Sequence, residues 1–274
     1  MQDCYQVVVV KFGTRSTRKS DVYLNFDIYD IADDPIDMDY YFWVLQNERH
    51  TVVVDTGFSQ VAGIRRKRTS LINPAEAFAA LGVSGDDAPD VVITHAHYDH
   101  AGNLDLFPSS RVIMSQAEYE FWTSPLASRK QFAHIVEEAD LRQIVRAHDE
   151  ERLTTFSGHM QLTPGVELIE VGGHTPGQIV VKVLTSEGNT LLASDAIHYY
   201  EEYEADMPFM LVADLPRMYS TFDTIRSMMD DDVRYLVPGH DPSTLGRFTP
   251  VPHGRLSGIA ATIGSLKKEE NTTL

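Results

Sequence analysis

Three histidines and an aspartate stand close together in the segment Thr94-His95-Ala96-His97-Tyr98-Asp99-His100. Imidazole nitrogens and carboxylate oxygens are donors that zinc accepts. His95 and His97 point the same way in an extended or turning backbone, because side chains alternate along it, so together they can hold one ion. Asp99 and His100, where the chain turns into a helix, can reach a second position beside it. The segment predicts a metal site, and a surface patch of histidines is the alternative.

Three further candidate ligands each follow the pattern of a β-strand. His174 lies in Gly172-Gly173-His174-Thr175-Pro176-Gly177, where the glycines allow a tight turn and a close approach of the backbone to an ion. Asp195 follows the apolar run 191–193, and His240 follows 235–237. Taken singly, Asp195 is as well explained as a helix cap and His240 as a loop residue. Together with the first four residues they complete two coordination spheres.

The elements that must position these residues are indicated by short apolar and β-branched runs. Strands are expected at 5–12, 22–29, 40–46, 51–54, 91–94, 166–171, 179–184, 190–193 and 235–237, and an exposed acidic loop at 30–39. Helices are expected at 74–81, 115–122, 131–147 and 216–229. The order of strands and helices predicts an α/β protein, and the absence of a low-complexity linker favours one domain over residues 1–274.

The composition limits the classes of partner that the protein is expected to bind. The formal net charge of -17 opposes binding to nucleic acid and to anionic membranes. The one basic run, Arg65 to Arg68, is interpreted as a solvated loop, with a specific anion site as the alternative. Cys4 is the only cysteine, so no internal disulfide and no cysteine-based metal site is expected. No apolar stretch approaches the 18 residues of a membrane span, and a cytoplasmic protein is expected.

The full ligand set resembles that of the metallo-β-lactamase fold superfamily, whose His-X-His-X-Asp-His motif is highly specific. The resemblance implies a four-layer αββα sandwich with the metals at one edge, between the two sheets. It also implies which residues bind: His95, His97 and His174 one ion, Asp99, His100 and His240 the other, with Asp195 bridging the two. Asp55, in Asp55-Thr56-Gly57, would orient a ligand.

Among branches of that superfamily, the N-acyl homoserine lactonase-like enzymes are the most similar in length and ligand pattern. The antibiotic-degrading branch uses cysteine where Asp195 stands, and the diiron flavin branch uses glutamate where His97 stands. The stretches 37–43 and 52–57 are also similar to those of the lactonases. One position departs from them, because His198 stands where that branch has a substrate-binding tyrosine. His198 could donate a hydrogen bond to an oxyanion, or it is a loop residue.

The expected activity is opening of a lactone ring such as that of an N-acyl homoserine lactone. Two Zn²⁺ ions, or other divalent transition metals, would hold a bridging hydroxide that attacks the carbonyl. Asp99, Asp195 and His198 are the expected catalytic residues, with Asp99 passing a proton to the leaving group. Hydrolysis of thioesters or other carboxylic esters is one alternative, and a non-haem iron enzyme of the sulfur dioxygenase type is another. A non-catalytic metal-binding protein is a third.

Substrate selection is expected in a helical insertion near 115–150 over the active site. Phe107, Tyr119, Phe121 and Trp122 would form an apolar wall there, with packing in the core as the commoner fate of such aromatics. The same helical region is an alternative dimer interface, so the expected partners are a small lactone or ester and a second copy of the chain. The acidic runs 30–39 and 201–204 either border the entrance or are solvated.

Overall fold

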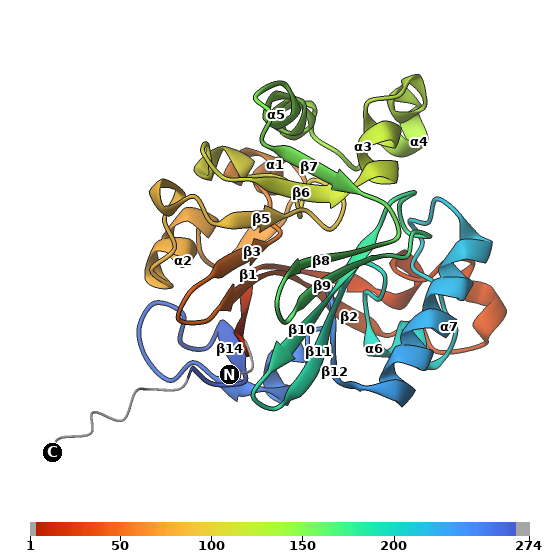
Figure 1. Ribbon diagram of the computed structural model, residues 1–274. Coiled ribbons are helices and arrows are strands. Elements are labelled where there is room, and N and C mark those ends of the chain that lie inside the picture. The colour runs from red at the N-terminus through yellow and green to blue at the C-terminus, as the bar shows by residue number, and fades with distance from the viewer. Residues whose placement is uncertain (1–3, 267–274) are drawn as a thin grey trace, which may run out of the picture.

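Two β-sheets face each other at the centre of the molecule in the computed structural model, which describes residues 4–266 (Figure 1). The larger sheet has the strand order β13-β14-β1-β2-β3-β5-β6-β7, with β4 paired to β1. Its strands are β1 (Gln6–Arg18), β2 (Pro35–Gln46), β3 (Thr51–Val54), β4 (Thr69–Ser70), β5 (Asp90–Val92), β6 (Val112–Ser115), β7 (Leu153–Phe156), β13 (Thr249–Pro250) and β14 (Ala260–Ile263). The carboxyl-terminal segment thus returns to pair beside the first strand.

The smaller sheet has the order β12-β11-β10-β9-β8. Its strands are β8 (His159–Thr163), β9 (Val166–Glu170), β10 (Ile179–Thr185), β11 (Gly188–Ser194) and β12 (Val233–Pro238). Apolar side chains of both sheets, among them Trp43 and Val181, form one buried cluster between them. The two sheets therefore pack as the inner layers of a sandwich.

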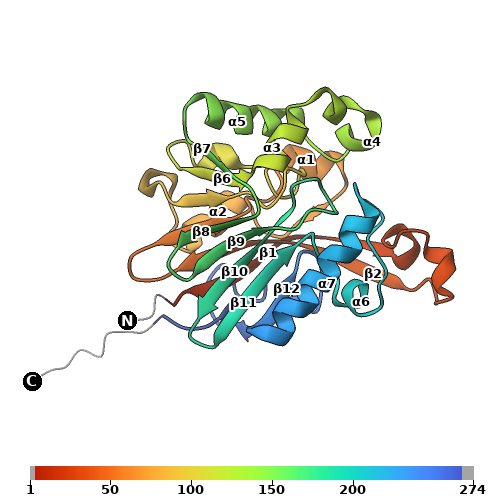
Figure 2. The same cartoon turned by 45° about the vertical axis from the view of Figure 1, so that its right-hand side comes forward.

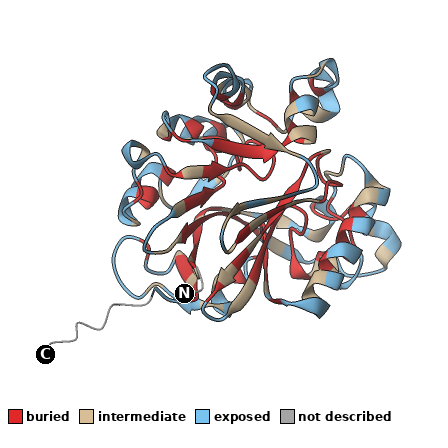
Figure 3. Cartoon of the chain, viewed as in Figure 1, coloured by how far each residue is buried: buried red, intermediate tan, exposed pale blue. Residues whose placement is uncertain are grey.

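Helices cover the outer face of each sheet, as the two views show (Figures 1 and 2). Over the larger sheet lie α1 (Gln60–Arg65), α2 (Pro74–Ala80), α3 (Gln116–Trp122), α4 (Lys130–Ala133) and α5 (Glu138–Asp149). Over the smaller sheet lie α6 (Tyr200–Glu204) and α7 (Leu215–Asp231). Separate buried clusters underlie the two helical layers, and the buried residues concentrate along the strands (Figure 3). The predicted αββα sandwich is confirmed.

The topology brings the candidate ligands to one edge of the sandwich. The segment His95 to His100 follows the end of β5, and His174 follows the end of β9. Asp195 directly follows β11, and His240 follows β12, which is parallel to β11. Carboxyl ends of parallel strands are the usual place for a site in α/β proteins. None of the helices within residues 4–266 has the length and apolar character that a membrane crossing requires.

The strand expected at 22–29 is wrong. Val22 and Tyr23 are buried, but this segment forms turns and a short 3-10 helix, Phe26–Tyr29. Asn25 and Asp30 both adopt a left-handed backbone, which interrupts an extended chain. The apolar residues instead pack beside residues 208–210, where Tyr23 forms an isolated bridge with Phe209. The apolar residues of this segment are buried by tertiary packing and do not belong to a regular strand.

The exposed loop expected at 30–39 is only half right, because β2 begins at Pro35. Asp39, the last residue of the predicted loop, is completely buried. Lys11 lies 2.6 Å from its Oδ2, and Thr14 donates a hydrogen bond to Oδ1 at 2.6 Å. Partners on β1 therefore stabilise a charge that the sequence pattern placed in solvent.

The helix expected at 131–147 is interrupted, since α4 ends at Ala133 and α5 begins at Glu138. The intervening carbonyl groups have partners elsewhere: the N–H of Tyr98 donates to Ile135, and Arg66 donates to His134 and Val136. The same contacts correct the interpretation of the basic run. Arg66 is only partly exposed, and its guanidinium lies 4.1 Å from the centre of the Tyr98 ring.

Candidate metal centre

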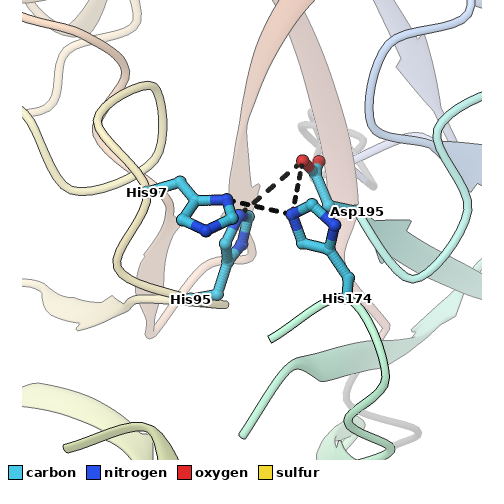
Figure 4. A group of neighbouring side chains, drawn as sticks. All are labelled: His95, His97, His174 and Asp195. Atoms are coloured by element: carbon cyan, nitrogen blue, oxygen red, sulfur yellow. Dashed lines mark hydrogen bonds and ion pairs between the residues drawn. The ribbon is translucent and has the colours of Figure 1, made fainter. Parts of the chain in front are cut away.

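Two groups of candidate metal-binding side chains meet at the strand ends. The first group consists of His95, His97, His174 and Asp195, which each offer a ligand atom within 4.8 Å of the others. Figure 4 shows their rings and carboxylate converging on one point. The second group, with the same spacing limit, consists of Asp99, His100 and His240. All seven side chains are buried, so the structure excludes the alternative of a surface histidine patch.

Asp195 faces both groups at once. Its Oδ2 lies 3.4 Å from Nε2 of His174 and 3.7 Å from Nε2 of His95. Its Oδ1 lies 3.2 Å from Nε2 of His100 and 3.2 Å from Nε2 of His240. The helix that follows begins at Tyr200 with Tyr199 as its cap, so Asp195 is not the helix cap that was its alternative interpretation. It occupies the position a bridging carboxylate needs.

A glycine makes room for this carboxylate. A Cβ atom placed on Gly239 would lie 2.4 Å from Oδ1 of Asp195. No side chain fits at that distance, so only glycine lets the end of β12 approach the end of β11 this closely. The Pro238-Gly239-His240 turn thereby brings His240 against Asp195.

Three of the histidines are oriented through their Nδ1 atoms. Nδ1 of His100 lies 2.7 Å from a carboxylate oxygen of Asp55, and Nδ1 of His174 lies 2.7 Å from the Leu211 carbonyl oxygen. Nδ1 of His240 lies 2.7 Å from the carbonyl oxygen of Asp39. These oxygens accept hydrogen bonds, so each ring carries its proton on Nδ1 and turns Nε2 toward the centre.

Asp55 also restrains the strand that precedes the histidine segment. Its two carboxylate oxygens accept from the Thr94 N–H and hydroxyl, each at 2.8 Å. Thr94 in turn lies 2.8 Å, hydroxyl to hydroxyl, from Ser194, the residue before Asp195. Asp55 and Ser194 both have positive φ angles, a strained conformation that concentrates at functional sites. Burial raises the pKa of Asp55, whereas the adjacent His100 opposes that rise.

The electrostatics differ between the two groups. Burial, reinforced by neighbouring imidazoles, holds the pKa values of His95 and His97 well below the ordinary histidine value. Burial likewise lowers the pKa of His174 to about 3. Burial also disfavours a charged His100, but the carboxylates of Asp195, Asp55 and Asp99 outweigh it and raise its pKa. The lowered pKa values of the first group favour the neutral imidazole, the form that metal ligation requires.

The residues present fit two divalent metal ions. Nε2 of His95, Nε2 of His100 and Oδ1 of Asp195 are buried without a hydrogen-bond partner in the described part of the chain. Buried polar atoms without partners are costly, and here they converge on the same small volume. Five imidazoles and two carboxylates form the mixed nitrogen and oxygen donor set that zinc and related transition metals accept.

His198 lies beside this centre and is fully buried. Its Nε2 lies 3.3 Å from Asp195 Oδ2 and has no hydrogen-bond partner among residues 4–266, whereas its Nδ1 lies 3.1 Å from Glu202. Burial would lower the pKa of His198, but the charges of Glu202 and Asp195 raise it to about 9. The ring stacks on Phe209 with centroids 3.9 Å apart. His198 lies in the loop between β11 and α6, buried beside the two ligand groups.

Glu202 was missed by the sequence analysis, which treated the run 201–204 as a rim or solvated segment. It is completely buried and accepts hydrogen bonds from the backbone N–H groups of His198, Tyr199 and Phe209. The same carboxyl group lies 3.1 Å from Nδ1 of His198, so it joins three backbone N–H groups and the imidazole. The spacing of four residues between the two was the available signal.

An apolar cavity of about 260 Å³ opens beside the first group. His97 and His174 line it, together with Phe121, Trp122, Gln131, Phe132, Ile135, Thr175, Pro176 and residues 210–213. Two of the four aromatics predicted as a wall, Phe121 and Trp122, are therefore at the cavity. The prediction is wrong for Phe107, which is buried in the core, and Tyr119 stacks on His148 away from the cavity lining.

Comparison with known proteins identifies the class. The family model of the metallo-beta-lactamase superfamily matches residues 38–240. An N-acyl homoserine lactonase of Bacillus thuringiensis is 25% identical over 182 residues, which cover 61% of this chain and 67% of that protein. The chain belongs to the metallo-β-lactamase superfamily.

Solved structures show the same fold. The crystal structure of a quorum-quenching N-acyl homoserine lactone lactonase matches with a TM-score of 0.77 at 19% identity, covering 92% of this chain and 99% of that one. The dizinc quorum-quenching lactonase AidC, in complex with the product N-hexanoyl-L-homoserine, matches with a TM-score of 0.69 at 19% identity, covering 98% and 96%. Both structures share the architecture across nearly the whole chain.

Proposed function

We propose that this protein is a dinuclear metal-dependent hydrolase that opens the lactone ring of N-acyl homoserine lactones. The observation that carries the proposal is the position of Asp195 between two ligand groups, the first of which contributes His97 and His174 to the lining of an apolar cavity. The curated relatives named as N-acyl homoserine lactonases support this choice of substrate. We also propose that the protein is cytoplasmic.

The proposed ligands follow the two groups. His95, His97 and His174 hold one ion, Asp99, His100 and His240 hold the other, and Asp195 binds both. Zinc is the proposed metal, because it prefers nitrogen donors combined with carboxylate oxygen. When bound, the two ions would lower the pKa of a shared water toward neutrality and polarise the lactone carbonyl.

Residues of this chain are proposed to transfer the protons that the reaction requires. Water adds to the carbonyl carbon, the ring C–O bond breaks, and the ring oxygen leaves as an alkoxide that must receive a proton. Asp99 is proposed to take the proton from the attacking water and deliver it to that oxygen, since its carboxylate lies at the centre, 3.8 Å from His240 Nε2. The products are a hydroxyl group and a carboxylic acid on one open chain, and the acid then releases the second proton of the water to solvent.

His198 is proposed to position the substrate carbonyl. The Glu202 carboxylate accepts from its Nδ1 and so directs Nε2 toward Asp195 and the centre. A protonated ring offers an N–H to the carbonyl oxygen as negative charge develops there. His198 would thus replace the tyrosine expected at this position, with Glu202 maintaining its orientation.

The cavity is proposed to hold the acyl chain. Its wall is largely apolar, with aromatic rings from α3 and α4 and aliphatic residues from 210–213. Because it begins at His97 and His174, a chain lying in it would place the attached lactone at the ligand groups.

The first experiment is metal analysis of the purified protein, paired with hydrolysis of lactones of increasing acyl-chain length. About two zinc ions per chain and ring opening that depends on chain length are expected. Two zinc ions without lactone opening, but with hydrolysis of thioesters, would replace the substrate and retain the hydrolase. One iron per chain with no hydrolysis of either substrate would contradict the proposal and favour the dioxygenase alternative.

A further inference from the structure

A buried carboxylate outside the two ligand groups connects the loops of the first group to the cavity wall. Glu118, on α3, is fully buried. Its Oε1 accepts from the backbone N–H of Ala96 at 2.9 Å and from Nε1 of Trp122 at 2.6 Å. Its Oε2 accepts from the backbone N–H of Gly177 at 2.9 Å. One side chain on α3 therefore contacts two loops that are distant in the sequence, as well as Trp122 at the end of its own helix.

The three donors lie in the two loops that carry the first ligand group and in the wall of the cavity. Ala96 lies between the candidate ligands His95 and His97, and Gly177 ends the glycine-rich loop that carries His174. Trp122 lines the cavity, and its ring centre lies 5.8 Å from that of His97. A shift of the Glu118 carboxylate would consequently move both ligand loops and the cavity wall.

Packing around Glu118 leaves little freedom for independent movement. The hydroxyl of Ser115, which caps α3, donates to the Gly177 carbonyl oxygen at 2.7 Å. A Cβ atom on Gly177 would lie 2.2 Å from that hydroxyl oxygen and 2.2 Å from the backbone nitrogen of Glu118. The first turn of α3 and the His174 loop are thus in direct contact.

A packing role alone does not explain a charge at this place. Burying a carboxylate is costly, and an apolar residue would fill the same volume without that cost. Burial raises the pKa of this carboxyl group, and the three N–H groups, none of which carries a charge itself, oppose that rise. What the carboxylate adds is a rigid link with two acceptor atoms directed at two ligand loops.

We propose that Glu118 is a positioning residue that sets the separation of His97 and His174 and links it to Trp122. Nε2 of His174 and Nδ1 of His97 lie 3.0 Å apart across the first group, so a small loop movement changes the geometry available to an ion. An acyl chain against Trp122 and a metal ion in the first group then influence each other's binding. This inference rests on the proposed metal site and cavity occupant.

The first test compares Glu118→Gln with the matched variant Glu120→Gln, an exposed glutamate on the same helix. Glutamine has one acceptor oxygen and one NH₂ group, so at least one of the three N–H donors loses its partner. In Glu118→Gln, the affinity for one of two Co²⁺ ions should fall about 10- to 100-fold in chelator competition, the size of effect seen for other residues that orient metal ligands. The absorption spectrum of the bound Co²⁺ should also change. Glu120→Gln should leave both unchanged. Parental affinity and spectrum in Glu118→Gln would overturn the inference.

The second test uses Trp122→Phe, which retains an aromatic ring and removes only the Nε1–H donor, and so serves if Glu118→Gln does not fold. In the parent, decanoyl-homoserine should change the Co²⁺ spectrum more than acetyl-homoserine, because only the longer chain reaches Trp122. In Trp122→Phe the two compounds should give the same spectrum. If the two compounds gave spectra that differ as much in Trp122→Phe as in the parent, the link through Trp122 would be overturned. Since Co²⁺ binding needs no turnover, these results stand apart from failure of the lactonase proposal.

Discussion

The ligand groups and the helices of residues 115–150 bury titratable groups in different ways. At the ligand groups, unpartnered atoms such as His95 Nε2, His100 Nε2 and Asp195 Oδ1 converge on one place. In the helices, Asp140 on α5 is 6% exposed. Within residues 4–266 its Oδ2 has no hydrogen-bond partner, and no ligand group forms around it. Convergence indicates a ligand, whereas an isolated buried carboxyl only reduces stability.

The two regions also differ in what they present to a substrate. The ligand groups stand on loops that directly follow strands, and their orientation is set by hydrogen bonds to Asp55, Asp39 and Leu211. The helices present aromatic rings to the cavity. Changes at the ligand groups should therefore reduce turnover and metal binding, and changes in the helices should alter substrate size preference or stability.

The largest expected effect is that of Asp99→Ala. Removing both a proposed ligand and the proposed proton carrier should lower kcat/KM by at least about 10³-fold. The fold should persist, because the side chain lies at the edge of the sandwich and not between the sheets. Steady-state kinetics and circular dichroism measure the two properties. Substantial turnover in a folded Asp99→Ala protein would contradict the proposed mechanism.

The second prediction concerns stability and pH at Asp140. Burial and the nearby Asp105 raise its pKa from 3.8 to about 7, against the opposing charges of Arg66 and Arg65. The unfolded chain then loses this proton at lower pH than the folded protein does, so its contribution to stability falls as pH rises from about 4 to about 7. Asp140→Asn should remove a penalty of up to about 4 kcal/mol at pH 8.

The measurement is urea unfolding of Asp140→Asn and the parent at pH 8 and pH 5, with only the difference between the two proteins interpreted. The gain should be smaller at pH 5, because the parent's carboxyl is mostly protonated in the folded state there. An equal gain at both pH values would show that ionisation of Asp140 is not its cause.

The third prediction tests the support of the second ligand group. Asp55→Asn keeps the shape of the side chain but removes the charge that faces His100 Nδ1. Affinity for one of two metal ions should fall about 10- to 100-fold, measured by chelator competition. Asp231→Asn, at an exposed position at the end of α7, is the control and should bind both ions as the parent does. Loss of both ions together would show that the two groups are not separable.

The smallest expected effect is on substrate size. Phe132 lines the cavity from α4 and packs edge-on against Phe121, with ring centres 4.9 Å apart. Phe132→Ala should lower kcat/KM about tenfold for long-chain lactones and leave short-chain lactones unchanged. Val145→Ala, on α5 but outside the cavity lining, should have no such selectivity. Equal losses for all chain lengths would place Phe132 in general packing.

The sequence by itself predicted the candidate ligands and determined the architecture around them. Residue type and the position after a strand are local properties, so His95, His97, Asp99, His100 and His174 could be predicted as donors without a structure. The resemblance carried by that order of ligands also predicted the αββα sandwich, which the structure and the family match bear out.

Only the tertiary structure decided which buried charges support the centre. Glu118 and Glu202 lie in segments whose composition resembles ordinary surface helix, and their burial depends on loops distant in the sequence, such as the one ending at Gly177. The same cause explains the errors at 22–29 and 131–147, where contacts with residues 208–210 and with Arg66 replaced the regular backbone pairing. Such contacts join residues far apart along the chain, and local periodicity carries no information about them.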